Sequence, residues 1–98
     1  MDWSRVVFTS HMTEAAALVA ECQVVLDFSP GPQATYEIKV YRVLKGSGAP
    51  FFATGERRDD PSAGFRPLGE GASPEEALQA CLEAAGVYHR RQERQGSI

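Results

Sequence analysis

The feature that most constrains the fold is a strictly alternating segment at residues 35–40. Tyr36, Ile38 and Val40 fall on one side of an extended chain, and the residues between them are polar or charged. Successive side chains of a β-strand point to opposite faces, so this spacing predicts a strand with one buried face. Alternation of this kind is typical of antiparallel sheets that face the core on one side only.

A second strong signal predicts a helix that begins after Ser73. Ser73 is a suitable N-cap, Pro74 suits the first helical position, and Glu76 completes a capping box. The helix ends near Gly86 or continues to Arg94, and both endings remain open. An apolar stripe follows the cap at helical spacing: Leu78, Cys81, Leu82 and Ala85.

The N-terminal region gives weaker signals. Residues 1–12 form either an edge strand or, since Ser10-His11-Met12 looks like a cloning remnant, a vector-derived extension. Thr13 is a plausible N-cap, and three consecutive alanines favour helix, so a short helix is expected to follow. Its apolar stripe consists of Ala15, Leu18, Val19 and Cys22.

Three further strands are expected. Residues 24–28 alternate before a Pro/Gly turn at 29–32, and 51–54 form a short aromatic run after the turn at 45–48. Residues 65–68 are expected to form a brief strand, which Pro67 confines to an edge. Gly69-Glu70-Gly71 is interpreted as a flexible turn that leads into the capped helix.

These signals predict one α+β domain over residues 13–98. It has a three- to four-stranded antiparallel sheet, a long C-terminal helix packed on one face and a short N-terminal helix. A chain of 98 residues is expected to have one core. The order of the strands is left open.

Composition narrows the protein class. The longest apolar run is too short to cross a bilayer, and Met1-Asp2-Trp3 lacks the basic residues of a secretory signal, so a cytoplasmic location is expected. Cys22 and Cys81 lie far from other metal ligands and are interpreted as buried free thiols. We expect neither a metal nor a cofactor.

Two segments together resemble the double-stranded-RNA-binding domain. In that family a Gly-Pro turn precedes an aromatic-led strand, as in GPQATYEIKV, and a Gly-x-Gly-x-Ser turn precedes an Ala-rich helix, as in GEGASPEEALQACLEAA. The match spans roughly residues 13–89, and the connection at 45–64 is an insertion. The family grips RNA phosphates with lysines at the start of the last helix, where this chain has Pro74, Glu75 and Glu76.

The segment at residues 71–78 is also similar to the sheet-and-helix lobe of HicB-type antitoxins. There, short strands lead through a Gly-x-Ser/Thr turn into a Glu-Glu-Ala-Leu helix, matched by Gly-Ala-Ser-Pro-Glu-Glu-Ala-Leu here. That lobe binds a toxin protein, while a separate C-terminal segment of the family reads DNA. The resemblance therefore implies a protein partner for this chain.

Two groups of residues are candidates for binding. Tyr41 and Val43, with Lys39, fall on the polar face of the alternating strand, where they mark a partner-binding surface or packing under the N-terminal segment. The leading hypothesis is therefore a non-enzymatic binding or regulatory module that contacts another protein or a second copy of itself. Sheet edges are a second route to such contacts.

The alternative function is nucleic-acid binding. Arg90, Arg91 and Arg94 form the basic cluster, and Lys39 and Lys45 would support it. A net charge of −3 adds no overall attraction to nucleic acid, and a solvated helix end explains the same arginines.

An enzyme is the least favoured class. The sequence contains no nucleophile elbow, phosphate loop or zinc-protease motif. An unfamiliar site would be sought where polar side chains converge between the helix and the loop at 57–64. His11 and His89 are the two histidines that could act as bases, and His89 is more simply interpreted as a helix-face residue.

Overall fold

The computed structural model describes residues 14–27, 33–46, 48–60 and 62–96, with side chains as far as Arg91. Four strands precede one helix: β1 (Ala15–Asp27), β2 (Gln33–Lys45), β3 (Phe51–Arg57), β4 (Leu68–Gly71) and α1 (Pro74–Gly96). The predicted edge strand or cloned extension at 1–12 and the turn at 29–32 lie outside the described residues.

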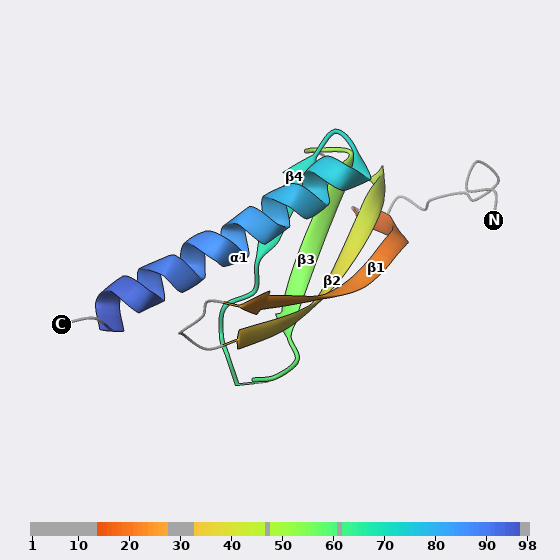
Figure 1. Ribbon diagram of the computed structural model, residues 1–98. Coiled ribbons are helices and arrows are strands. Elements are labelled where there is room, and N and C mark those ends of the chain that lie inside the picture. Colours follow the sequence, from red (N-terminus) through yellow and green to blue (C-terminus); the bar gives the residue numbers. More distant parts are fainter. Residues whose placement is uncertain (1–13, 28–32, 47, 61, 97–98) are drawn as a thin grey trace.

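The strands form one antiparallel sheet in the order β1-β2-β3-β4, so each strand pairs with its neighbour in sequence. Figure 1 shows α1 lying across one face of the twisted sheet, with its first turns beside β4. The prediction of an α+β fold with an antiparallel sheet and a long C-terminal helix on one face is confirmed. β1 and β4 are the two edges.

The core face of β2 is the one that the alternation predicted. Tyr36 and Ile38 are 1% exposed and Val40 is 2% exposed. The remaining core residues are small, which allows the helix and the sheet to approach closely: Ala34, Ala53, Ala77, Cys81 and Ala85. Among the described residues, every fully buried core residue of α1 therefore has a side chain no larger than cysteine.

The N-terminus of α1 has the predicted cap. The backbone N–H of Glu76 donates to Ser73 Oγ at 3.1 Å, and Glu76 Oε2 accepts the N–H of Ala72 at 2.8 Å. The first bond satisfies an amide of the first turn that the helix itself leaves unpaired. In the second, Glu76 bonds to the residue before the N-cap rather than to the Ser73 amide that a capping box uses. The helix then continues through Gly86 to Gly96, so the longer of the two predicted endings is the observed one.

Two glycines of β4 bring the helix against the sheet. A β-carbon built on Gly69 would overlap the backbone of Ala77 and Cys81, and one on Gly71 would overlap the first turn of α1 at Glu76. Only glycine fits such a close approach. α1 consequently packs mainly on β4 and β3 and reaches β1 least.

The predicted short helix after Thr13 is wrong over the described residues, because Ala15–Asp27 is a strand. β1 pairs with β2 from Ala15↔Lys45 to Asp27↔Gln33. The helix propensity of the alanines is a weak preference, and pairing with a strand of equal length overrides it. The period-two pattern of Cys22, Val24 and Leu26 continues the strand and carries their side chains toward the core.

The fourth strand was predicted in the wrong place. β4 begins at Leu68 rather than ending there, and Gly69-Glu70-Gly71 belongs to it instead of forming a flexible turn. Pro67 lacks an N–H and precedes the strand, and its carbonyl accepts the N–H of Gly55 at 2.9 Å. The predicted edge position of this strand is confirmed.

Both cysteines are free. Cys81 is buried, and burial raises the pKa of its thiol to about 11, whereas Cys22 is only half-buried. Cys81 therefore packs as a small apolar group, as predicted. No helix in the described part of the chain has the length and apolar character that a membrane span requires.

We predict that Gly69→Ala destabilises the fold by about 1–3 kcal/mol or more, because the added methyl group must push the helix backbone away. Denaturant unfolding followed by circular dichroism measures the change. Gly64→Ala is the matched control, since a β-carbon at Gly64 meets nothing within 4 Å. Equal stability of the two variants would contradict the close packing of α1 on β4.

Candidate functional site

A group of apolar side chains lies on the sheet face opposite α1. Tyr41 of β2 is directly opposite Phe52 of β3, and their rings stack with centroids 5.0 Å apart at 19°. Leu18 of β1 is paired with Tyr41, and Val43 follows two residues along the same face of β2. Leu68 adds the contribution of β4. We call these five residues the aromatic face.

The aromatic face is half-buried at Tyr41, Val43 and Phe52 and exposed at Leu18 and Leu68. Leu18 is 51% exposed and Leu68 is 55% exposed, while the two rings between them are partly covered by each other. Cross-strand pairing explains the arrangement, because directly opposite residues of an antiparallel sheet project from the same face. Apolar side chains from all four strands therefore project from this face, with Leu68 opposite Thr54 and Glu70 opposite Phe52.

A shallow hollow adjoins the aromatic face at the end of β2. Its volume is about 330 Å³, and Val43 and Phe52 form part of its wall. Small apolar side chains at Ala15, Ala16 and Ala49 complete the apolar lining. Three charged residues also line it: Glu14, Lys45 and Glu70. The hollow thus combines an apolar floor with charges of both signs.

The predicted partner-binding residues all lie on this side of the sheet. Tyr41 and Val43 belong to the aromatic face, and Lys39 lies two residues before Tyr41, 3.7 Å from the Glu37 carboxylate. The packing alternative, in which the N-terminal segment covers Tyr41 and Val43, involves residues outside the described ranges.

Sequence reasoning missed Leu18, Phe52 and Leu68. Leu18 was placed in a helical stripe, and Leu68 was placed at the end of a strand that it in fact begins. The alternation of Phe51 and Phe52 was an available signal, since consecutive strand residues face opposite sides. Phe51 packs against the core, so Phe52 belongs to the other face.

The arginine cluster is separate from the aromatic face. Arg90 and Arg91 are exposed on α1, which covers the opposite side of the sheet from Lys39. The two arginines line different hollows on the helix, one with Leu82 and one with Phe65. Arg94 lies in the last turns of α1, where side chains are not described. The structure therefore does not join Lys39 to these arginines.

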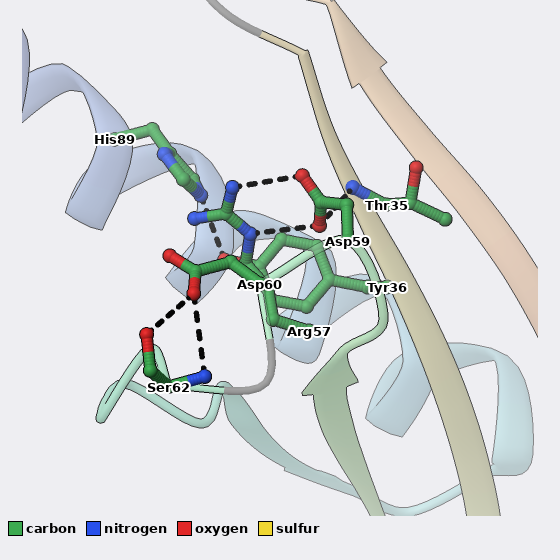
Figure 2. A network of polar contacts seen from close by, with 7 residues as sticks. All are labelled: Thr35, Tyr36, Arg57, Asp59, Asp60, Ser62 and His89. Carbon is green, nitrogen blue, oxygen red and sulfur yellow. Dashed lines mark hydrogen bonds and ion pairs between the residues drawn. The ribbon is translucent and has the colours of Figure 1, made fainter.

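Polar side chains do converge where α1 passes the loop after β3, as Figure 2 shows. Tyr36 Oη lies 2.7 Å from Nε2 of His89, which joins β2 to the helix. Arg57 donates from Nε and Nη2 to the two carboxylate oxygens of Asp59, at 3.0 and 2.9 Å. Asp59 Oδ1 also accepts the backbone N–H of Thr35 at 3.1 Å.

The electrostatics of this network follow from burial and from the Arg57–Asp59 pair. Burial raises the pKa of Tyr36, and burial followed by the charge of Arg57 lowers the pKa of His89. The hydrogen bond from Arg57 holds the pKa of Asp59 far below its usual range. At neutral pH the network therefore holds a neutral phenol, a neutral imidazole and a compensated ion pair.

The network joins α1 and the loop after β3 to β2. Its groups bind one another, and the buried Tyr36 ring leaves little room for a substrate beside its hydroxyl. A hollow of about 240 Å³ nearby is lined by Arg57, Arg58 and Arg66. Each of these guanidinium groups is paired with a carboxylate, so the hollow has no excess positive charge.

A metal site is not formed by the described residues. No three carboxylate, cysteine or histidine side chains among them gather closely enough to hold an ion. Glu75 and Glu76, the one pair of adjacent acids at a helix start, serve the cap and the helix dipole.

We predict that the stability of the chain falls as the pH drops below about 6.5, the usual pKa of histidine. The folded state lowers the pKa of His89, so the unfolded state binds the proton more readily and acid favours unfolding. Unfolding free energies measured between pH 7.5 and pH 5 test this.

His89→Gln is the control for that measurement, since its amide oxygen can still accept from Tyr36 but does not titrate. The slope of stability against pH in this interval should become smaller in the variant. An unchanged slope would show that His89 is not the group responsible.

Comparison with known proteins gives no further guidance: no protein-family model, curated protein or solved structure matches this chain. The double-stranded-RNA-binding and HicB-type resemblances therefore stay predictions. What the chain does has to be inferred from its own residues and their geometry.

Proposed function

We propose that this chain is a non-enzymatic binding module that holds a partner protein on the aromatic face. The observation that carries the proposal is the stacked Tyr41–Phe52 pair on the side of the sheet that α1 does not cover. When one face of an antiparallel sheet is open to solvent, the side chains on that face are normally polar. The apolar side chains of the aromatic face depart from that pattern, and among the described residues they are not part of the core cluster.

The composition of the surface supports a protein partner. Protein interfaces are enriched in aromatic side chains at their centre and carry polar groups at the rim. Tyr41 and Phe52 provide such a centre, and charged residues surround it: Glu14, Glu21, Lys39, Lys45 and Glu70. The mixed signs at the rim favour a partner with both acidic and basic groups, which would fix its orientation.

The hollow beside Phe52 has room for an anchoring side chain of the partner, one that inserts into the interface. Side chains that dominate protein binding usually fill small, well-packed pockets near the centre of an interface. A volume of about 330 Å³, with Val43 and Phe52 on its wall, suits one large apolar side chain of the partner. Lys45 and Glu70 at its border offer polar contacts to the same segment.

The nucleic-acid alternative has less support. Binding to the phosphate backbone needs several cations on one surface. Arg90 and Arg91 line different hollows of α1, and Lys39 is on the other side of the sheet beside Glu37. This alternative stays a prediction, and the experiment below distinguishes it.

We predict that the double variant Leu18→Lys/Leu68→Lys loses the protein partner. Both side chains are more than half exposed, so the changes should leave the fold intact while placing charges at the interface. Capture of the tagged chain from its own cells, after nuclease treatment and with quantitative mass spectrometry, measures the loss.

Val87→Lys is the matched control, because Val87 is 44% exposed but lies on α1. We expect a nuclease-resistant protein to be retained by the native chain and by the control, and reduced at least tenfold by the double variant. Equal retention by all three forms would contradict the proposal, and so would enrichment that disappears with nuclease.

A further inference from the structure

The outer edge of β1 is a second interaction surface. β1 is an edge strand of 13 residues, and β2 is its one partner strand among the described residues. The backbone groups on its other side face away from the sheet. Such a row of peptide groups is a template for pairing with another strand.

The two edges of the sheet differ in protection. β4 has four residues, is preceded by Pro67 and is covered by α1, all of which discourage pairing with another chain. β1 contains no proline, lysine or arginine, and its two charged residues are Glu21 and Asp27. Besides these two carboxylates, the protective feature at this edge is irregular pairing.

That irregularity is limited to the first part of β1. Register shifts occur between Ala15 and Ala16 and between Leu18 and Ala20. From Ala20↔Val40 to Asp27↔Gln33 the pairing with β2 is regular. Because bulges disturb the edge where they occur, the accessible and regular edge consists of residues 20–27.

We propose that two copies of the chain pair through this edge, antiparallel, with Gln23 of one copy opposite Gln23 of the other. The two four-stranded sheets then become one continuous sheet with both helices on the same face. The aromatic faces stay uncovered on the other side. This dimer is therefore independent of the proposed function, and either can fail without the other.

Charge excludes two of the possible registers. Directly opposite residues of antiparallel strands share a face, so the two-fold axis must pass through a residue of β1. An axis at Glu21 would place two carboxylates opposite each other. An axis at Val24 would place Glu21 opposite Asp27, which is again a like-charge pair.

Length and packing choose among the remaining registers. An axis at Cys22 pairs only residues 20–24 of the regular edge and an axis at Val25 only residues 23–27, whereas an axis at Gln23 pairs residues 20–26. Axes closer to either end pair fewer residues still. At Gln23 the two amide side chains can exchange hydrogen bonds, and Glu21 faces Val25. On the face that packs against α1, Cys22 of one copy lies opposite Val24 of the other, and Ala20 lies opposite Leu26. These apolar side chains, which α1 leaves at least partly exposed, then cover one another.

The interface is small, which sets the expected affinity. Seven paired residues at about 3.3 Å each give a contact roughly 23 Å long. An edge contact of this size lies in the range of weak, transient interfaces. We therefore expect a reversible dimer with a dissociation constant in the micromolar range.

Cysteine cross-linking of the full chain tests the register. In a Cys22→Ala background, Gln23→Cys brings two thiols opposite each other at a Cα separation of about 4.5–5.5 Å, within reach of a disulfide. Val25→Cys is the matched control on the same face of β1. It faces Glu21, and the two introduced thiols lie about 13 Å apart along the strand.

Mild oxidation of concentrated protein should convert Gln23→Cys to a covalent dimer at least tenfold faster than Val25→Cys. Equal rates, or a Gln23→Cys protein that stays monomeric, would overturn the proposal.

Sedimentation equilibrium of two lysine variants gives a readout that does not depend on disulfide geometry. Gln23→Lys opposes like charges across the axis and should weaken the dimer at least tenfold. Val25→Lys faces Glu21 and should leave association unchanged or tighter. The reverse order, equal weakening, or a native chain that remains monomeric at several hundred micromolar would overturn the proposed pairing.

Discussion

The close contact between Gly69 and the backbone of α1 determines where the helix can lie, and the rest of the architecture depends on that position. Because β4 presents glycine to the helix, and the helix presents Ala77 and Cys81 in return, the two backbones approach more closely than larger residues would allow. This draws α1 over β3 and β4. The core side of β1 is left half-covered, and no helix of the described residues covers the opposite face of the sheet.

A second contact fixes the direction of the helix. The hydrogen bond between Tyr36 and His89 joins α1 to β2 about two turns beyond Cys81's contact with Gly69. The Arg57–Asp59 pair secures the neighbouring loop to Thr35. The polar residues that converge here thus hold the helix and loop in place. The aromatic face and the edge of β1 are the two surfaces that we propose for partners.

Local sequence patterns correctly predicted those strands and helices whose own residues favour the conformation that they adopt in the packed structure. The alternation around Tyr36 identified the buried face of β2, and the Ser73 cap identified the start of α1, because strand period and capping are properties of neighbouring residues. The same alternation placed Tyr41 and Val43 on the face away from the core.

The remaining elements depend on pairing between distant residues. The alanines at the start of β1 favour helix locally, and only the long β2 strand beside them makes the extended form preferable. Gly69 and Gly71 resemble a turn until the helix is packed on them. Leu18 could join the candidate site only after β1 had been recognised as a strand, and the pairing of Phe52 with Tyr41 depends on the register of β2 and β3.

The central claim is that β1 is an edge strand whose outer backbone groups pair with no other described part of the chain. Residue-resolved amide hydrogen exchange of the native chain in dilute solution, where the weak dimer dissociates, tests it most directly. Alternate amides of residues 20–27 should exchange rapidly, because neighbouring residues of an edge strand point their N–H groups in opposite directions, while amides of β2 and β3 should exchange slowly. Uniform slow exchange along β1 in dilute protein would contradict the account, since it would show that another part of the chain already pairs with this edge.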